Sequence, residues 1–271
     1  MTIESYDFYD VHADRARLGM QSQIFSTYIR AHALPILGSQ IHSILDLGCG
    51  EGQLGLALRS IYPQARLVGL DQDAAAIAKV QKIQAMGIRN VEFVAGDMEQ
   101  GLPPGPFDLI YASLSLSHLR NPVGLVPRLV QALAPGGYLW IKDLGPDMEH
   151  AGTHPAYQQL VRLCFSALAT LGAHMQVIDE LRPPLLAAGL APVQEEIEAY
   201  PLGGLSAAGR AILTNMLSIF YVSRQAISRV HHLPEQEVSA LCFAVSRAAL
   251  ETEHELGTCP FANLILQRPS A

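Results

Sequence analysis

Three glycines at alternate positions follow an acidic residue in the segment Asp46-Leu47-Gly48-Cys49-Gly50-Glu51-Gly52. Glycine allows backbone conformations with positive φ, and because it has no Cβ it lets a ligand approach the main chain closely. A helix that follows such a loop directs its unpaired N–H groups into the same space. The segment is therefore expected to let a ligand approach its backbone closely.

The glycines alone fit two classes of ligand. Gly50-Glu51-Gly52-Gln53-Leu54-Gly55 matches the G-x-G-x-x-G pattern of dinucleotide-binding proteins, and Asp71 follows about twenty residues later, as that pattern requires. A second register begins earlier and reads D-x-G-x-G-x-G from Asp46. The loop by itself does not decide between these registers.

The elements that must position this loop alternate along the first half of the chain. Five short apolar runs, each followed by Gly, Asp or Ser, have the composition of strands buried on both faces: 43–47, 66–70, 91–95, 108–112 and 138–142. Segments with helical composition separate them: 53–61, 73–86 and 122–133. This alternation predicts right-handed βαβ crossovers and a doubly wound sheet. Ligands of such sheets bind beyond the carboxyl ends of the strands, so the polar residues at those ends matter most.

The second half of the chain has a different pattern. Helices are expected at 155–171, from Ser206 through Ile227, and from Pro234 onward. Residues 193–200 have strand composition mixed with glutamates, which favours an edge or antiparallel strand. The apolar run 261–266 is expected to return to the sheet as its last strand.

Further segments follow the glycine loop in a recognisable order. They are Val68-Gly69-Leu70-Asp71, Val94-Ala95-Gly96-Asp97-Met98, Phe107-Asp108-Leu109-Ile110 and Leu133-Ala134-Pro135-Gly136-Gly137-Tyr138-Leu139. With the D-x-G-x-G-x-G segment, this ordered set resembles the motifs of class I (Rossmann-like) methyltransferases, which use S-adenosylmethionine. It covers about residues 42–143 and favours the methyl donor over a dinucleotide. Arg15–Ile24 also resembles the R-x-R-L-x-x-Q segment ahead of the sheet in one group of small-molecule methyltransferases.

The resemblance implies a complete architecture. It is an α/β fold with a doubly wound, seven-stranded, mostly parallel sheet whose last strand is antiparallel, plus an N-terminal helix and a helical insertion that act as a cap. The expected division is an N-terminal helical lid (1–40), a cofactor-binding core (41–200), a helical cap insertion (201–258) and a final core strand (259–271).

The resemblance also assigns cofactor-binding roles at the first strand. Asp46 is expected to face the amino acid end of S-adenosylmethionine, where a carboxylate complements an ammonium group. Gly48 and Gly50 are expected to pack their backbone against the methionine part and the ribose.

The remaining cofactor roles fall at the ends of the next strands. Asp71 is expected to accept both ribose hydroxyls, and Gln72 to lie beside the adenine. Asp97 is expected to accept from the exocyclic amine, and the Met98 N–H to donate to a ring nitrogen. Ser113 is expected near the sulfur end. For Asp71 and Asp97, capping of the following helix is the alternative.

The methyl acceptor is less well defined by the sequence. Methyl transfer from a sulfonium is an in-line displacement, so proximity contributes most and a general base is needed only when the acceptor must lose a proton. His118, after the fourth strand, is the candidate base, although a packed structural histidine is the alternative. Asp108, at the start of its strand, is interpreted as structural.

Composition narrows the classes of function. The chain has 271 residues, a net charge of −7 and 49% hydrophobic residues, so a large core is expected and nucleic acid is not an expected partner. Four cysteines without C-x-x-C spacing, an N-terminus unlike a signal peptide and no apolar run of about 20 residues favour a cytoplasmic protein without a membrane partner. No metal site is expected, since His231-His232 lacks acidic or cysteine neighbours at ligand spacing.

These observations support one function and one alternative. The first is methylation of an oxygen, nitrogen or carbon on a small, rather apolar metabolite, with S-adenosylhomocysteine as the second product. The alternative is a protein of the same fold that binds the cofactor without methylating, as a rearrangement or cyclisation catalyst or a binding module. The apolar helix faces permit a homodimer. The sequence does not identify the acceptor.

Overall fold

The computed structural model describes residues 11–85, 87–148 and 152–270 of the chain. Residues 1–10 of the predicted lid lie outside this part. The described residues form two compact units. The sheet unit comprises Phe25–Asp143, Gln176–Glu196 and Ala262–Ala271, and the helical unit comprises Met1–Ile24, Leu144–Met175 and Ile197–Phe261. The division into lid, core, cap and final strand stays a prediction.

The described residues contain a mixed sheet of seven strands. The strands are β1 (Ser43–Leu47), β2 (Arg66–Asp71), β3 (Val91–Ala95), β4 (Phe107–Ser113), β5 (Leu133–Leu144), β6 (Ala191–Gly203) and β7 (Glu255–Gln267). Their order is β3-β2-β1-β4-β5-β7-β6, with β7 antiparallel, which confirms the predicted fold class. Dinucleotide-binding sheets have the order 3-2-1-4-5-6, so the insertion of β7 between β5 and β6 sets this sheet apart from them.

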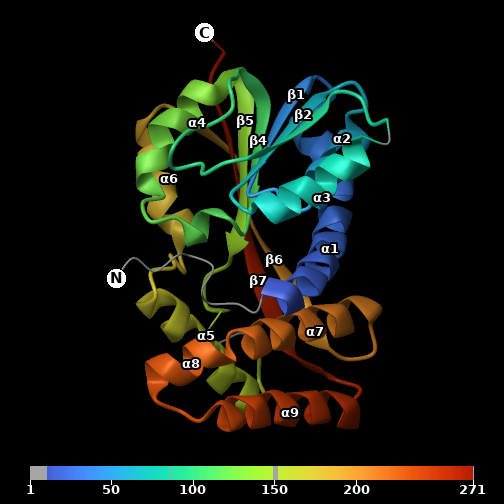
Figure 1. The fold of residues 1–271 in the computed structure, drawn as a ribbon, viewed down its shortest axis with the longest axis vertical. Helices are drawn as coiled ribbons and strands as arrows, with labels where there is room; N and C mark the ends of the chain where they lie inside the picture. The colour runs from blue at the N-terminus through green and yellow to red at the C-terminus, as the bar shows by residue number, and fades with distance from the viewer. Residues whose placement is uncertain (1–10, 86, 149–151, 271) are drawn as a thin grey trace. The chain divides into compact units, whose positions relative to one another are not determined.

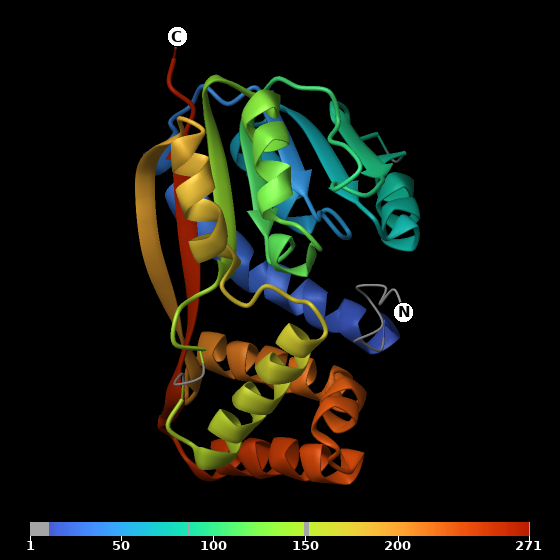
Figure 2. The ribbon, with the colours of Figure 1, turned by 90° about the vertical axis from the view of Figure 1, so that its left-hand side faces the viewer.

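The described residues form helices in both units. In chain order they are α1 (Val11–Leu37), α2 (Gln53–Ile61), α3 (Ala74–Gln84), η1 (Leu116–His118), η2 (Val123–Leu125), α4 (Val126–Ala132), α5 (Pro155–Thr170), α6 (Val177–Ala187), α7 (Ala207–Val222), α8 (Arg224–His231) and α9 (Glu235–Glu251). Within the sheet unit, α4 and α6 lie on one face, and α2, α3 and the second half of α1 lie on the other (Figures 1 and 2).

The alternation of side chains along β1 shows how this core is built. Leu45 and Leu47 belong to the apolar cluster with α4 and α6, whereas Ile44 belongs to the cluster with α2 and α3. Successive residues of a strand point to opposite faces, so a strand buried on both faces must be apolar throughout. Asp46 is the exception in β1, and its carboxylate is buried beside the glycine loop.

Most predicted elements are confirmed, one helix was missed and one predicted helix is wrong. The five early strands, the edge strand β6 and the returning strand β7 lie where the sequence indicated. Helix α6 was not predicted, because Pro183 and Pro184 lie inside it and proline normally ends a helix. The helix predicted from Ser206 through Ile227 is two helices, because the chain breaks at Ser223 between α7 and α8.

The helical unit is held together by its own core. Helices α5, α7, α8 and α9 pack on one another, and the ring of Tyr157 on α5 meets the ring of Phe220 on α7 edge to face. Ser206 caps α7 as predicted, since its Oγ accepts from the N–H of Gly209 at 2.9 Å. In the part of the chain that is described, no helix is long and apolar enough to cross a membrane.

Candidate functional site

The glycine loop forms a tight turn between β1 and α2 that only glycine accommodates. Gly48 and Gly52 have φ of 69° and 76°, in the left-handed region. A Cβ on Gly48 would lie 2.3 Å from the Ser115 Cβ, and one on Gly52 would lie 2.6 Å from the Phe93 ring. A Cβ on Gly50 would meet nothing within 4 Å. The loop is therefore packed tightly on two sides and has open space at Gly50, where a ligand can reach the backbone.

Asp46 is a buried acid at the carboxyl end of β1. Its side chain is only 2% exposed, and its Oδ2 accepts from the N–H of Gly55 in α2 at 3.0 Å. Burial raises the pKa of Asp46 to about 7; the bond from Gly55 opposes this rise, and the nearby charge of Asp71 adds to it. A cationic group placed beside Asp46 would offset this penalty.

Asp71, at the end of β2, joins that strand to the loop. Its Oδ2 accepts from the N–H of Gly50 at 2.7 Å, and its Oδ1 accepts from the N–H of Asp73 at 2.8 Å. Burial also raises the pKa of Asp71, although these two bonds oppose the rise. Each carboxylate oxygen has a second lone pair, so Asp71 can still accept from two hydroxyl groups. Asp46 and Asp71 thus place two buried acids beside one loop.

The segment after β3 lies next to the end of β2. Ala95 pairs with Asp71, and the N–H of Gly96 donates to the Asp71 carbonyl oxygen at 2.9 Å. Asp97 is exposed, and its Oδ1 accepts from the N–H of Glu99 at 2.8 Å, so it caps the following turn. Capping is the alternative role that the sequence analysis gives for Asp97. It uses one carboxylate oxygen and leaves the other for a ligand.

Two other predicted residues flank these acids. Met98 is buried in the apolar cluster beneath α4 and α6. Gln72, directly after Asp71, is exposed. The parallel strands β1, β2 and β3 therefore bring the predicted cofactor residues of their carboxyl ends to one edge of the sheet, while the role of each residue stays a prediction.

The chain after β4 is held against the glycine loop in a strained conformation. Leu114 has a φ of 50°, which costs a side chain about 1–2 kcal/mol, and its N–H donates to the Lys142 carbonyl oxygen at 2.8 Å. Ser115 Oγ donates to the Leu47 carbonyl oxygen at 2.9 Å and fills the space beside Gly48. Among the described residues, the buried Ser113 Oγ has no hydrogen-bond partner. Such strain and an unsatisfied hydroxyl are common at functional sites.

Sequence reasoning missed the roles of Leu114 and Ser115. Serine and leucine alternate from Ser113 to Ser117, so nothing local distinguishes the serine that contacts Leu47. His118 ends η1 in the same segment, and its N–H donates to the Ser115 carbonyl oxygen at 3.3 Å. The structure thus places His118 on the segment that also carries Ser113, and its role as a base stays a prediction.

Asp108 is structural, as predicted. Its Oδ2 accepts from the N–H groups of His42 and Ser43 at 2.8 and 2.9 Å, at the opposite end of β4 from Ser113. The bonds tie the start of β1 to the start of β4. This acid therefore holds the two central strands in register and is not part of the candidate site.

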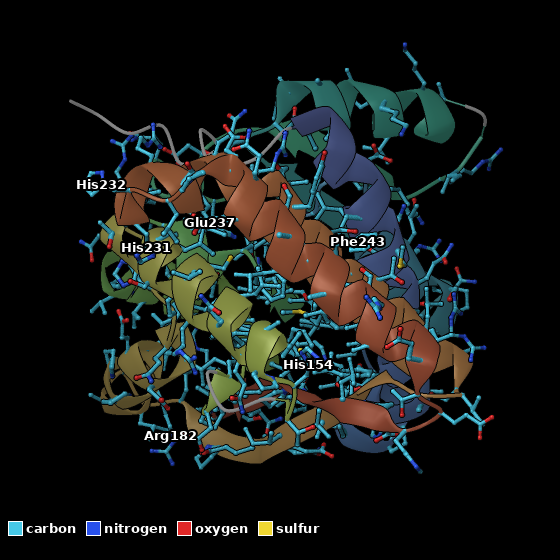
Figure 3. All side chains as sticks on the ribbon, turned by 90° about the horizontal axis from the view of Figure 1, so that it is seen from below. His154, Arg182, His231, His232, Glu237 and Phe243 are labelled. Atoms are coloured by element: carbon cyan, nitrogen blue, oxygen red, sulfur yellow. The ribbon has the colours of Figure 1, made fainter. Side chains whose placement is uncertain are left out.

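His154 lies apart from His231 and His232 in the helical unit (Figure 3). His154 precedes α5, whereas His231 is the last residue of α8 and His232 follows it as the C-cap. The His231 Nε2 lies 2.9 Å from the Leu163 carbonyl oxygen. No group of three or more His, Cys, Asp or Glu side chains in the described ranges is arranged to hold a metal ion.

Comparison with known proteins identifies related sequences. A sequence model of the methyltransferase domain matches residues 40–181, just over half of the chain. The trans-aconitate 2-methyltransferase of Acidovorax sp. (strain JS42) is 36% identical over 117 residues, which are 43% of this chain and 43% of that protein. The trans-aconitate 2-methyltransferase of Klebsiella pneumoniae (strain 342) is 33% identical over 121 residues, 45% of this chain and 46% of that protein. The matches thus span less than half the length of these relatives.

Solved structures extend the likeness in fold to most of the chain. The [4+2]-cyclase SpnF has a TM-score of 0.57 and 18% identity, over 91% of this chain and 81% of that one. The plantazolicin methyltransferase BpumL, in complex with S-adenosylhomocysteine, has a TM-score of 0.54 and 16% identity, over 95% of this chain and 88% of that one. At these identities the likeness shows the fold alone.

Proposed function

The chain belongs to the class I methyltransferase domain family, and from this premise we propose that it transfers a methyl group from S-adenosylmethionine to a small molecule. The proposed acceptor atom is an oxygen, nitrogen or carbon of a rather apolar metabolite. The observation that carries the proposal is the pair of buried acids, Asp46 and Asp71, beside a glycine loop that has open space at Gly50.

The residues of the sheet unit fit the cofactor chemically. The amino acid end of S-adenosylmethionine carries an ammonium group, and the raised pKa of Asp46 is what a nearby cation would lower. Asp71 has lone pairs for the two ribose hydroxyls, and the backbone at Gly48 and Gly50 would contact the methionine and ribose parts. The Ser113 Oγ would lie near the sulfur end of the cofactor and gain a partner there.

The adenine would be held by the segments after β2 and β3. We propose that Gln72 lies beside the adenine ring. The Asp97 carboxylate would accept from the exocyclic amine, and the Met98 N–H would donate to a ring nitrogen. The cap that Asp97 forms with Glu99 uses one carboxylate oxygen, so both roles are compatible. These hydrogen bonds would orient the adenine, which itself stays uncharged.

The reaction requires the protein mainly to position the methyl acceptor. S-adenosylmethionine, when bound, supplies a methyl group already activated by a sulfonium. The chain must hold the acceptor atom in line and exclude water, and such proximity can contribute about 7–11 kcal/mol. His118 would accept a proton if the acceptor must lose one, which typically adds about 10²–10⁴-fold in rate.

The relatives suggest which acceptor to test first. Two of them are named trans-aconitate 2-methyltransferases, so trans-aconitate, a polar tricarboxylate, is the acceptor to test against a rather apolar metabolite. Because the matches cover less than half of each relative, the acceptor of this chain is a separate proposal from its use of the cofactor. The cytoplasmic location and the homodimer that the apolar helix faces permit also stay predictions.

Isothermal titration with S-adenosylmethionine tests the proposal. We expect saturable binding that Asp71→Ala weakens at least about tenfold, since the variant loses both ribose contacts. Glu92→Gln is the matched control, because Glu92 is an exposed acid on β3 of the same unit and forms a surface ion pair with Arg66. No detectable binding at millimolar cofactor would refute the proposal.

A protein of this fold that does not methylate is the second candidate. The observation that favours it is the fold-level likeness to a [4+2]-cyclase. The two candidates differ in the fate of the cofactor, because methyl transfer converts one S-adenosylmethionine to S-adenosylhomocysteine per turnover. Chromatography of the reaction mixture measures both products. Conversion of a substrate with no formation of S-adenosylhomocysteine would establish the second candidate instead.

A further inference from the structure

Glu99 lies in the turn after β3 and contacts the chain after β4. Its Oε1 accepts from the N–H of Asn121 at 2.8 Å, and its Oε2 accepts from the N–H of Arg120 at 3.2 Å. Strands β2 and β1 separate β3 from β4 in the sheet, so these bonds lie outside the ladder of strand pairs. The Glu99 carboxylate therefore joins two segments that the sheet itself keeps apart.

The backbone of Glu99 is held as well as its side chain. Its N–H donates to the Asp97 Oδ1 at 2.8 Å, and its carbonyl oxygen accepts from the Arg128 Nη1 on α4. A carboxylate that accepts from N–H groups forms charge-assisted bonds, which are stronger than those between neutral groups. Glu99 is thus fixed at three points, namely its carboxylate, its N–H and its carbonyl oxygen.

The segment that receives the Glu99 carboxylate is itself ordered. The Asn121 Oδ1 accepts from the N–H of Gly124 at 2.9 Å, at the start of η2. This bond keeps the Asn121 backbone in the turn that presents its N–H to Glu99. The carboxylate therefore has a fixed anchor.

The position of Glu99 has a consequence for Asp97. Asp97 is exposed, so packing does not select the orientation of its carboxylate. An exposed side chain that is not held samples several rotamers, and fixing one of them costs entropy. The bond from the Glu99 N–H holds the Asp97 Oδ1 and leaves Oδ2 for a ligand. The place of the Glu99 backbone therefore sets the direction in which Asp97 can accept.

Met98, between the two acids, is held in a different way. It is 8% exposed and belongs to the same apolar cluster as Leu116 and Leu119, which follow β4. Packing rather than the Glu99 carboxylate thus fixes Met98. A change at Glu99 is expected to disturb the contact of Asp97 with a ligand and to leave the Met98 N–H in place.

We propose that Glu99 is a positioning residue that makes the cofactor site selective for adenine. By holding the turn after β3 against Arg120 and Asn121, it keeps the Asp97 carboxylate oriented to accept from the exocyclic amine. Glu99 acts through Asp97, without a bond of its own to the base. The inference rests on the proposed use of S-adenosylmethionine and adds the residue that sets the choice of base.

Two ligands that differ only in the base measure this selectivity. S-inosylhomocysteine carries an oxo group where S-adenosylhomocysteine carries the exocyclic amine, so it presents an acceptor to the Asp97 carboxylate. A site built to bind a donor rejects an analogue that lacks it. In calorimetric titrations of the full chain, the wild type is expected to bind S-adenosylhomocysteine at least about tenfold more tightly than S-inosylhomocysteine.

Two variants and a control assign the selectivity to Glu99. Glu99→Ala removes the bonds to Arg120 and Asn121 and keeps the backbone N–H, and it is expected to lower the ratio of the two Kd values to below about threefold. Glu99→Gln keeps the shape, but its amide oxygen can replace only one carboxylate oxygen, so an intermediate ratio is expected. Glu92→Gln changes an exposed acid on β3 that pairs with Arg66, and it is expected to keep the ratio of the wild type.

A double-mutant cycle tests whether Glu99 acts through Asp97. Asp97→Ala is expected to abolish the selectivity by itself. Adding Glu99→Ala to this variant is then expected to leave the ratio of the two Kd values unchanged, because the group that Glu99 positions is already absent. Losses of selectivity that add would show a separate route and overturn the proposal.

The ratio of the two Kd values distinguishes positioning from a general structural role. A loss of structure alone would weaken both ligands equally, so a folded Glu99→Ala variant with an unchanged ratio would overturn the inference and leave the proposed function standing. If Glu99→Ala does not fold, as judged by circular dichroism, Glu99→Gln decides by the same ratio. No binding of either ligand by the wild type at millimolar concentration would overturn the proposed function and this inference with it.

Discussion

Replacing Asp46 by asparagine should stabilise the free protein and weaken cofactor binding. Asp46 is 2% exposed, and its Oδ2 accepts from the Gly55 N–H at 3.0 Å. Asparagine has nearly the same shape and can present its amide oxygen to Gly55. The substitution therefore removes the ionisation of the side chain and leaves its packing and hydrogen bond in place.

The magnitude follows from the pKa. The Asp46 carboxyl ionises with its ordinary pKa of 3.8 in the unfolded chain and with a pKa of about 7 in the folded protein. Between these values the folded state keeps a proton that the unfolded state has lost, so the free energy of unfolding falls as the pH rises. At 1.36 kcal/mol per unit, the full difference is about 4 kcal/mol, and the part between pH 5 and pH 8 is about 3 kcal/mol.

Urea unfolding at pH 5 and pH 8 measures this difference. The chain has one tryptophan, Trp140, which is fully buried in the sheet unit, so its fluorescence reports on the unit that contains Asp46. The wild type should lose about 3 kcal/mol more than Asp46→Asn between the two pH values. The variant should also bind S-adenosylmethionine less tightly, since a neutral amide does not complement the ammonium group. If the variant keeps the pH dependence of the wild type, or is less stable at pH 8, the assigned burial and charge of Asp46 are wrong.

Three further predictions concern the same unit. Gly48→Ala should lower the free energy of unfolding in urea by about 2–4 kcal/mol, because the new Cβ meets Ser115 and φ at this position is positive. Adding Ser115→Gly should restore part of the lost free energy, and no restoration would exclude the contact. Tyr28→Phe should cost about 1 kcal/mol in the same assay, because it removes the bond from the Tyr28 Oη to the Glu196 Oε2 at 2.5 Å, and an unchanged free energy of unfolding would exclude that bond. Asp71→Asn should weaken S-adenosylhomocysteine binding in calorimetry, and an unchanged Kd would exclude Asp71 as the ribose acceptor.

The sequence predicted the elements whose signals are local. The five early strands are apolar throughout because both of their faces are covered, so their boundaries are visible as short runs. The glycine loop also has a local signal, because the three glycines that mark it in the sequence, Gly48, Gly50 and Gly52, all have positive φ. The predicted acids Asp46 and Asp71 lie beside the loop because parallel strands bring their carboxyl ends to one edge.

Tertiary contacts decided what the sequence did not predict. Helix α6 forms despite Pro183 and Pro184, with Val177, Leu181 and Leu185 at helical spacing buried against the sheet. Burial of this apolar stripe outweighs the hydrogen bonds that the prolines remove.

The contacts that hold the loop were also not predictable from local patterns. The bond from the Gly55 N–H to Asp46 and the bond from Ser115 to the Leu47 carbonyl oxygen each join segments that are separated in sequence. The left-handed backbone at Leu114 has no sequence signal, because leucine rarely adopts it. These features depend on how the sheet assembles.

Calorimetric titration of the full chain with S-adenosylmethionine at pH 6 and pH 8 tests the central claim most directly. The two buried acids beside the glycine loop predict saturable binding that is tighter at pH 8, since the Asp46 carboxyl must lose its proton before it can face the ammonium group. The absence of binding at millimolar cofactor, or equally strong binding of a nicotinamide dinucleotide in competition, would contradict the claim that this loop holds the methyl donor.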